Sequence, residues 1–164
     1  MSEHARELAD HFQRVAEAFA VEVERLSPRQ WRAFCAAEER TVAALARHVA
    51  WAYEVESVAF RAMAEGRHVP TWTEASLDRA NAEAGRADAA CGQAETVALL
   101  CRNAAAAADI VRWLTDKQLA RGGVYIEGEP AEPVAVWIED VLIGHPGMHL
   151  PAIWAATGAP AHGE

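Results

Sequence analysis

Three histidines have the residue type and spacing to bind one metal ion. His145 and His149 are four positions apart, so on a helix they differ by about 40° around the axis and their imidazoles can chelate one ion. His48 lies three residues after Leu45 and four before Ala52, on the apolar stripe of its own predicted helix. Three imidazoles in one apolar core are costly unless they share a partner. The pattern favours a site at His48, His145 and His149 for zinc, nickel, copper or iron.

Two features of this pattern leave alternatives open. Each histidine taken singly is also explained as a core residue whose ring hydrogen-bonds a backbone carbonyl. In addition, Gly144, Pro146 and Gly147 surround His145. Either the helix kinks at Pro146, at a cost of roughly 3 kcal/mol, or a new helix begins with His145 near its N-cap. Pro146 also stands where the H-E-x-x-H motif has its glutamate, which excludes the zinc protease mechanism.

Other ionisable side chains are weaker candidates. Carboxylates can orient metal-binding imidazoles from behind, and three of them are candidates for this role: Glu54, Glu56 and Asp140. A solvated helix face is the favoured interpretation of each. The remaining histidines fall in terminal or loop segments or at a stripe edge: His4, His68, His162 and His11. We expect the first three to be solvated and His11 to lie at the cavity or at the surface.

Apolar residues recur in steps of three and four along the segments that must position these side chains. They predict amphipathic helices over 3–26, 41–64 and 134–154. The alanine-rich, proline-free stretch 77–120 predicts further helix, divided or loosened at Gly85 and Gly92. Residues 29–40 read as a connection whose aromatics Trp31 and Phe34 cap one end of the core, and 124–126 as a short extended piece. Four helices without a set of strands predict an all-α four-helix bundle with long interhelical connections.

Length and charge narrow the class of protein. The 164 residues suit a single domain over 1–158 with a short tail at 159–164. The net charge of -9 gives no basic surface for nucleic acid or an anionic membrane. No apolar run approaches the roughly 20 residues that span a bilayer, and the charged N-terminus is unlike a signal peptide, so we expect a cytoplasmic protein. Cys35, Cys91 and Cys101 are widely spaced and are expected to be reduced and mostly buried.

Two segments resemble the DinB-like superfamily of metal-binding four-helix bundles, which includes mycothiol-dependent maleylpyruvate isomerases and bacillithiol transferases. The sequence TVAALARHV at 41–49 is similar to the family's second-helix segment, which ends in a ligand histidine. The sequence IGHPGMHLPAI at 143–153 is similar to the fourth-helix segment that supplies two more. The order and separation of the two segments match across nearly the whole chain.

This resemblance implies a four-helix bundle of the DinB type that pairs as a homodimer. It implies a divalent transition metal, zinc or nickel, bound by His48, His145 and His149 with water in the open position. Asn81 resembles an asparagine near the pocket of some relatives. The implied function is a metal-dependent thiol S-transferase that joins a low-molecular-weight thiol to electrophilic small molecules. The alternatives are a non-catalytic metal or small-molecule binding protein with a stress-related role and a helical interaction module without metal. The sequence identifies no catalytic residue.

Overall fold

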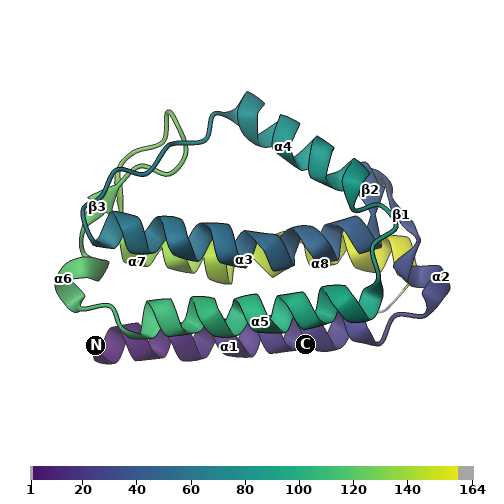
Figure 1. Cartoon of the computed structure of the whole chain (residues 1–164), viewed down its shortest axis with the longest axis horizontal. Coiled ribbons are helices and arrows are strands. Elements are labelled where there is room, and N and C mark those ends of the chain that lie inside the picture. Colours follow the sequence, from purple (N-terminus) through teal and green to yellow (C-terminus); the bar gives the residue numbers. More distant parts are fainter. Residues whose placement is uncertain (1, 159–164) are drawn as a thin grey trace.

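Four long helical segments lie side by side in the computed structural model, which describes residues 2–158 (Figure 1). They are α1 (Glu3–Glu24), α3 (Val42–Ala64), α5 (Gln93–Arg112) and a composite fourth segment made of α7 (Val134–Trp137), η2 (Ile138–Ile143) and α8 (His145–Thr157). The predicted all-α class is confirmed. The predicted tail at 159–164 and His162 lie outside the described residues.

The helix starts follow local capping chemistry. The Ser2 hydroxyl accepts a hydrogen bond from the Ala5 amide at the start of α1, and Thr41 does the same for Ala44 at the start of α3. These caps satisfy amides that the first turn of a helix leaves without partners. The predicted helices 3–26 and 41–64 therefore match α1 and α3 to within two residues.

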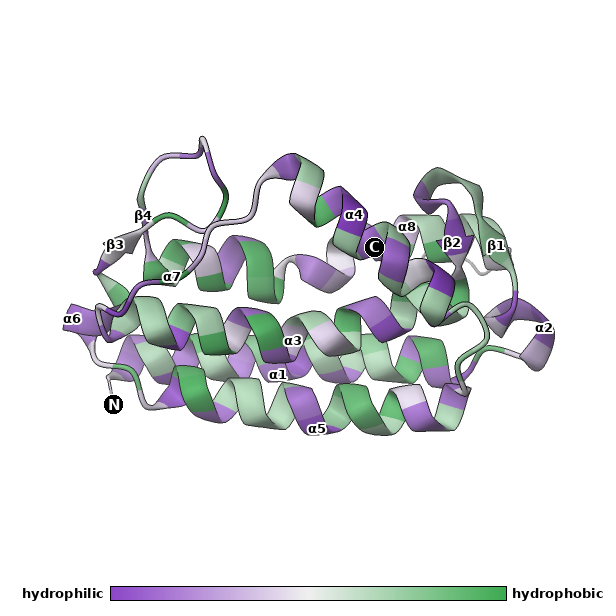
Figure 2. Cartoon of the chain, turned by 45° about the horizontal axis from the view of Figure 1, so that its top comes forward, coloured by the Kyte–Doolittle hydropathy of each residue, from purple (hydrophilic) through white to green (hydrophobic). Residues whose placement is uncertain are grey.

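The core lies between α1, α3, α5 and the fourth segment. Phe12 of α1 packs edge-on against Tyr53 of α3, with ring centroids 4.8 Å apart, and Leu100 of α5 is fully buried in the same core. Figure 2 shows hydrophobic and hydrophilic residues alternating along these helices, as a core-facing stripe requires. This packing fixes α3 and α8, the two helices that carry the histidines.

Helix α4 (Glu74–Ala87) is a crossover rather than a member of this core. It carries the chain back along the molecule, so α3 and α5 run in the same direction (Figure 1). None of its described residues is fully buried. Of the two glycines expected to divide or loosen 77–120, Gly92 is the N-cap of α5 and divides the region, whereas Gly85 lies inside α4 and does not divide it.

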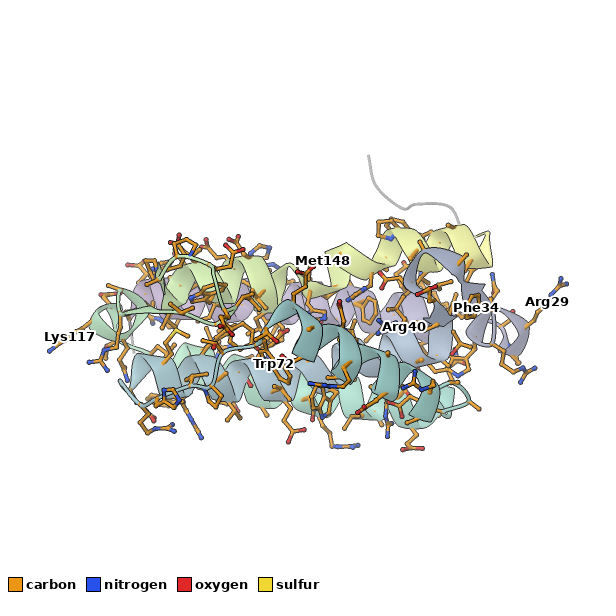
Figure 3. The ribbon with its side chains drawn as sticks, turned by 90° about the horizontal axis from the view of Figure 1, so that it is seen from above. Arg29, Phe34, Arg40, Trp72, Lys117 and Met148 are labelled. Atoms are coloured by element: carbon orange, nitrogen blue, oxygen red, sulfur yellow. The ribbon has the colours of Figure 1, made fainter. Side chains whose placement is uncertain are left out.

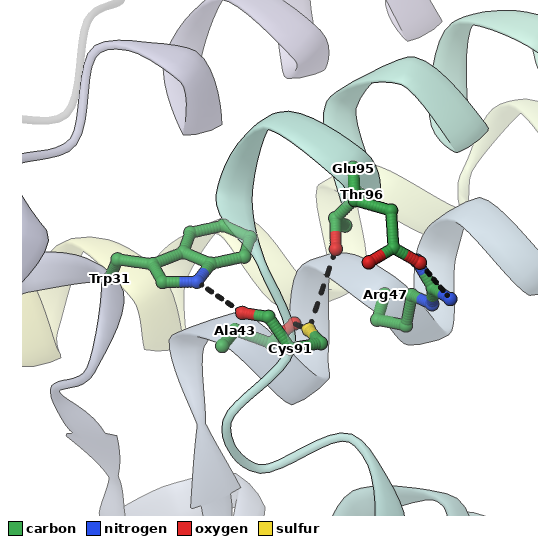
Figure 4. Close-up of polar contacts among 6 residues, drawn as sticks. All are labelled: Trp31, Ala43, Arg47, Cys91, Glu95 and Thr96. Carbon is green, nitrogen blue, oxygen red and sulfur yellow. Dashed lines mark hydrogen bonds and ion pairs between the residues drawn. The ribbon is translucent and has the colours of Figure 1, made fainter.

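The turn between α4 and α5 is tied to the beginning of α3 (Figure 4). The Trp31 indole donates to the Cys91 carbonyl at 2.8 Å. The Cys91 thiol donates to the Ala43 carbonyl at 3.4 Å and accepts from the Thr96 hydroxyl at 3.4 Å. These bonds hold the C-terminal end of α4 in a defined place above α3.

The fourth segment stays helical through its glycines and proline. η2 is a π-helix, and the Gly144 amide donates to the Glu139 carbonyl, five residues earlier, at 3.0 Å. α8 then begins at His145, and the Met148 amide donates to the Gly144 carbonyl at 3.3 Å. The structure thus places Pro146 in the first turn of a new helix, where proline is tolerated, and connects that helix to its predecessor by a π-turn.

Short strands occupy the connections. β1 (Phe34–Cys35) pairs with β2 (Arg40–Thr41) across η1 (Ala36–Glu38), after the single turn of α2 (Pro28–Trp31). α6 (Asp116–Leu119) precedes β3 (Gly122–Gly123), which pairs with β4 (Glu132–Pro133). The extended piece expected at 124–126 is not a strand, although Ile126 forms a bridge with Trp72.

Three further expectations concern exposure. Trp31 is buried as predicted, but Phe34 is 61% exposed and does not cap the core. All three cysteines are free, but only Cys35 is buried, Cys91 is half-buried and Cys101 is exposed, because Cys101 falls on the outer face of α5. Within residues 2–158, no helix has the length and apolar character to cross a bilayer.

Candidate metal centre

The three predicted histidines come together from two helices. His48 lies in the first half of α3, and His145 and His149 occupy the first two turns of α8. Their ligand nitrogens all lie within 4.8 Å of one another. The backbone at Gly144 and Pro146 therefore lets both α8 imidazoles face His48, because α8 begins at His145 and the pair is one helical turn apart.

The ring positions suit one ion. The Nε2 atoms of His145 and His48 are 3.1 Å apart, and two nitrogens on a tetrahedral zinc ion are separated by roughly 3.3 Å, given a bond length near 2.05 Å. The ring centroid of His48 lies 5.0 Å from that of His145 and 5.2 Å from that of His149. Three imidazoles at these separations could hold a single metal ion.

Carboxylates fix the outer nitrogens of two of the rings. The Nδ1 atom of His145 lies 2.8 Å from Oε1 of Glu56, and Nδ1 of His149 lies 2.9 Å from Oε1 of Glu38. An imidazole that donates its Nδ1 proton to a carboxylate presents a lone pair on Nε2, which is the ligand atom. Two of the three candidate ligands are thus held in the tautomer that binds metal.

The surroundings keep imidazoles uncharged. Burial lowers the pKa of His48 to about 2, with further lowering by His145, His149 and Arg40. Burial also lowers the pKa of His149, against the opposing effect of Glu38. Metal ions bind neutral imidazole. His48 and His149 are therefore in the protonation state that binding requires at neutral pH.

Glu56 is the most buried charged group at the site. The residue is 5% exposed, its Oε2 atom has no hydrogen-bond partner, and burial raises its pKa, with His145 opposing that rise. A buried carboxyl with one unsatisfied oxygen costs stability. A group kept at such a cost beside three histidines is typical of a functional site.

A cavity of about 290 Å³ opens next to the histidines, and we call it the chamber. All three imidazoles and Glu56 form part of its wall. The rest of the wall is mostly apolar and includes Trp51, Val55, Trp72, Leu77, Ile126 and Met148. An ion at the histidines would therefore face a space large enough for a small organic molecule.

The structure sorts the weaker candidates. Glu56 is at the site, whereas Glu54 and Asp140 are exposed on the outer faces of their helices; the expectation of a solvated face was wrong for Glu56. Asn81 of α4 does line the chamber. His4, His11 and His68 are exposed, so His11 lies at the surface rather than at the chamber.

Glu38 was missed by the sequence analysis. It belongs to η1, and its contact with His149 joins residues 111 positions apart. The sequence offers only its place in the acidic pair before the Thr41 cap, which does not distinguish Glu38 from Glu39. The hairpin of β1 and β2 is what brings it to α8.

The chain matches no family model, no curated protein and no solved structure. The donor set itself must therefore indicate the kind of ion. Three neutral imidazoles, two of them backed by carboxylates, suit zinc, nickel, copper or iron and are poor ligands for calcium or magnesium.

Proposed function

We propose that this protein binds one divalent transition-metal ion through His48, His145 and His149 and acts on a small molecule held in the chamber. One observation carries the proposal: three imidazole nitrogens meet within 4.8 Å at the wall of a cavity. Three protein ligands facing a cavity leave a position for a further ligand, which is typical of catalytic rather than structural zinc sites.

Zinc or nickel is the ion that we propose, in a bundle of the DinB type. Imidazole binds both metals well. The four helical segments lying side by side, with ligands on α3 and α8, support this assignment because the resembling segments at 41–49 and 143–153 supply those same helices.

The reaction that we propose is transfer of a low-molecular-weight thiol to an electrophilic small molecule. The thiol sulfur bonds to the electrophilic carbon, the bond from that carbon to its leaving group breaks, and the thiol proton passes to solvent. A divalent ion, when bound, supplies Lewis-acid chemistry that lowers the pKa of a ligand donor. Glu56 and Glu38 hold two imidazoles in place, and Trp51 and Val55 keep the chamber apolar.

One observation favours a second candidate, a non-catalytic protein that binds a metal or a small molecule. The described residues of the chamber wall include no serine, threonine, cysteine or lysine, which are the usual covalent nucleophiles. Any turnover must then depend on the metal ion and on the thiol that it activates.

Elemental analysis of protein purified without a histidine tag tests metal binding directly. We expect about one ion per chain, and we expect His48→Ala to lose it while His68→Ala, a substitution at an exposed loop histidine, retains it. Equal metal content in both variants, or none in the wild type, would refute the site.

A panel of low-molecular-weight thiols with 1-chloro-2,4-dinitrobenzene then separates the two candidates. An enzyme loses turnover in His48→Ala while the fold survives in the circular dichroism spectrum. Stoichiometric metal without turnover in the wild type assigns the non-catalytic role.

A further inference from the structure

Helix α4 separates two cavities of different chemistry. Leu77, Ala80 and Asn81 face the chamber beside the histidines. Residues on another face of the same helix, including Asp78 and Arg86, line a larger cavity of about 840 Å³, which we call the polar cavity. Positions 77, 80 and 81 are three and four apart, so they share one side of α4. Asn81 also lines the polar cavity, so α4 turns Leu77 and Ala80 to the chamber, Asp78 and Arg86 to the polar cavity, and Asn81 to both.

Charged side chains gather on the polar side. Glu38, Glu39, Arg40, Asp78 and Arg86 all line the polar cavity. Arg40 lies near the last turns of α4, where its side chain packs against Gly85, whereas Met148 and Trp72 lie near the first turns (Figure 3). The polar cavity therefore offers oppositely charged side chains to anions and to cations, and the chamber on the other side of α4 does not.

The chamber is nearly free of charge. Among the described residues of its wall, Glu56 is the one acid, and no lysine or arginine is present. Oε1 of Glu56 already contacts Nδ1 of His145, and the Glu56 residue is buried. An anion in the metal-free chamber would lose its hydration with no lysine or arginine in return, and a cation would meet a carboxylate that already contacts His145. Desolvation therefore disfavours either ion in the chamber.

Apolar surface continues from the chamber to the outside. Trp51 is 48% exposed and Met148 is 57% exposed, and both belong to the chamber wall. Asn81 is the polar side chain of α4 in that wall. A molecule entering here contacts the indole of Trp51 and the thioether of Met148, and the Asn81 amide can orient it by hydrogen bonding.

The wall formed by α4 is held at both ends. The Trp72 amide donates to the Tyr125 carbonyl at 3.0 Å, and the Glu127 amide donates to the Trp72 carbonyl at 2.8 Å. At the other end, the Thr41 hydroxyl donates to the Ala89 carbonyl at 2.9 Å. These bonds keep Leu77 and Ala80 turned toward the chamber.

We propose that the wall of the metal-free chamber selects an uncharged, largely apolar small molecule, on the scale of one aromatic ring with a short substituent, over carboxylates and ammonium ions of the same size. A cavity of about 150 Å³ holds one benzene molecule, and the chamber measures about 290 Å³. This substrate class rests on the proposed function only in placing the ion at the chamber wall.

Three ligands of matched size test this selectivity on the full-length chain: benzyl alcohol, benzoate and benzylamine. Their dissociation constants are measured by ligand-observed NMR on metal-free protein, because benzoate could coordinate a bound zinc ion directly. We expect benzyl alcohol to bind metal-free protein at least about tenfold more tightly than either ion. Because this binding is measured without metal, its result does not depend on whether the histidines bind an ion. Failure of the metal site is detected separately by elemental analysis.

Two substitutions on α4 locate the binding. Ala80→Arg places a cation in the chamber, and Ala82→Arg places the same side chain on the polar side, where Ala82 lines the polar cavity. We expect Ala80→Arg to weaken benzyl alcohol binding at least about tenfold and Ala82→Arg to change it less than about twofold. Benzoate or benzylamine binding as tightly as benzyl alcohol, equal effects of the two substitutions, or no benzyl alcohol binding at millimolar concentration overturns the proposal.

Discussion

Nδ1 of His149 and Oε1 of Glu38 lie 2.9 Å apart, although 111 positions separate the two residues in the chain. The contact joins η1, in the hairpin before α3, to the first turns of α8. It couples the orientation of a candidate ligand to the hairpin of β1 and β2.

Replacing Glu38 is expected to weaken metal binding without removing a ligand. In Glu38→Ala the His149 ring loses its hydrogen-bond partner, and loss of such a carboxylate typically lowers metal affinity by about 10- to 100-fold. Glu39→Ala is the matched control, because Glu39 is the exposed neighbour and does not contact a histidine in the described structure. Competition with a coloured chelator measures both affinities. The same affinity in the two variants would show that the Glu38 contact does not support the site.

Glu56→Gln is expected to separate function from stability. The amide oxygen still accepts from Nδ1 of His145, but it is a weaker acceptor than a carboxylate, so metal affinity should fall by about tenfold. Burial raises the pKa of Glu56, so its ionised form is disfavoured in the folded protein. Removing that charge should leave the metal-free protein equally stable or up to about 1 kcal/mol more stable at pH 7.5. Urea unfolding of the metal-free variant provides the measurement, and a clear loss of stability there contradicts this account.

The sequence predicts the helices and the convergence of the histidines because both follow from local periodicity. His48 lies on the stripe of α3 with Leu45 and Ala52, so the packing that buries the stripe also turns the imidazole inward. The pair His145 and His149 needs only one helical turn, which α8 provides. Such features depend on residues close together in the chain.

Other features depend on contacts that no local pattern contains. Glu38 reaches His149 only after the hairpin and α8 have packed. The orientation of α4 depends on hydrogen bonds at its ends, including that of Thr41 to Ala89, because the helix buries none of its described residues completely. A helix without a buried stripe has a position that periodicity cannot predict.

Gly144→Ala and Gly147→Ala are expected to change stability in opposite directions. A Cβ atom at Gly144 would overlap the Asp140 carbonyl oxygen, whereas one at Gly147 meets nothing within 4 Å. Gly144→Ala should therefore cost roughly 1–3 kcal/mol by overpacking the π-turn and should weaken metal binding through His145. Gly147→Ala should gain about 0.5–1 kcal/mol, since alanine favours a helix. Thermal unfolding of both metal-free variants, followed by zinc titration, decides the point. A stable Gly144→Ala variant with unchanged zinc affinity would mean that the π-turn does not position His145.

Acid is expected to destabilise the metal-free protein through His48. The pKa of His48 falls from 6.5 to about 2 on folding, so the unfolded chain binds the proton first. Stability attributable to His48 is therefore intact above about pH 6.5 and declines as the pH falls toward the folded pKa. Between pH 7.5 and 5.5 this loss amounts to about 1 kcal/mol for one histidine.

His48→Asn isolates this contribution, because asparagine does not titrate. Urea unfolding at pH 7.5 and 5.5 should show the wild type losing about 1 kcal/mol more than His48→Asn over that interval. The comparison cancels the contribution of the carboxylates to the pH dependence, because they titrate alike in the two proteins. Equal losses of stability in the wild type and His48→Asn would mean that His48 is solvated in the metal-free protein. The buried arrangement of the three histidines would then form only when the ion binds.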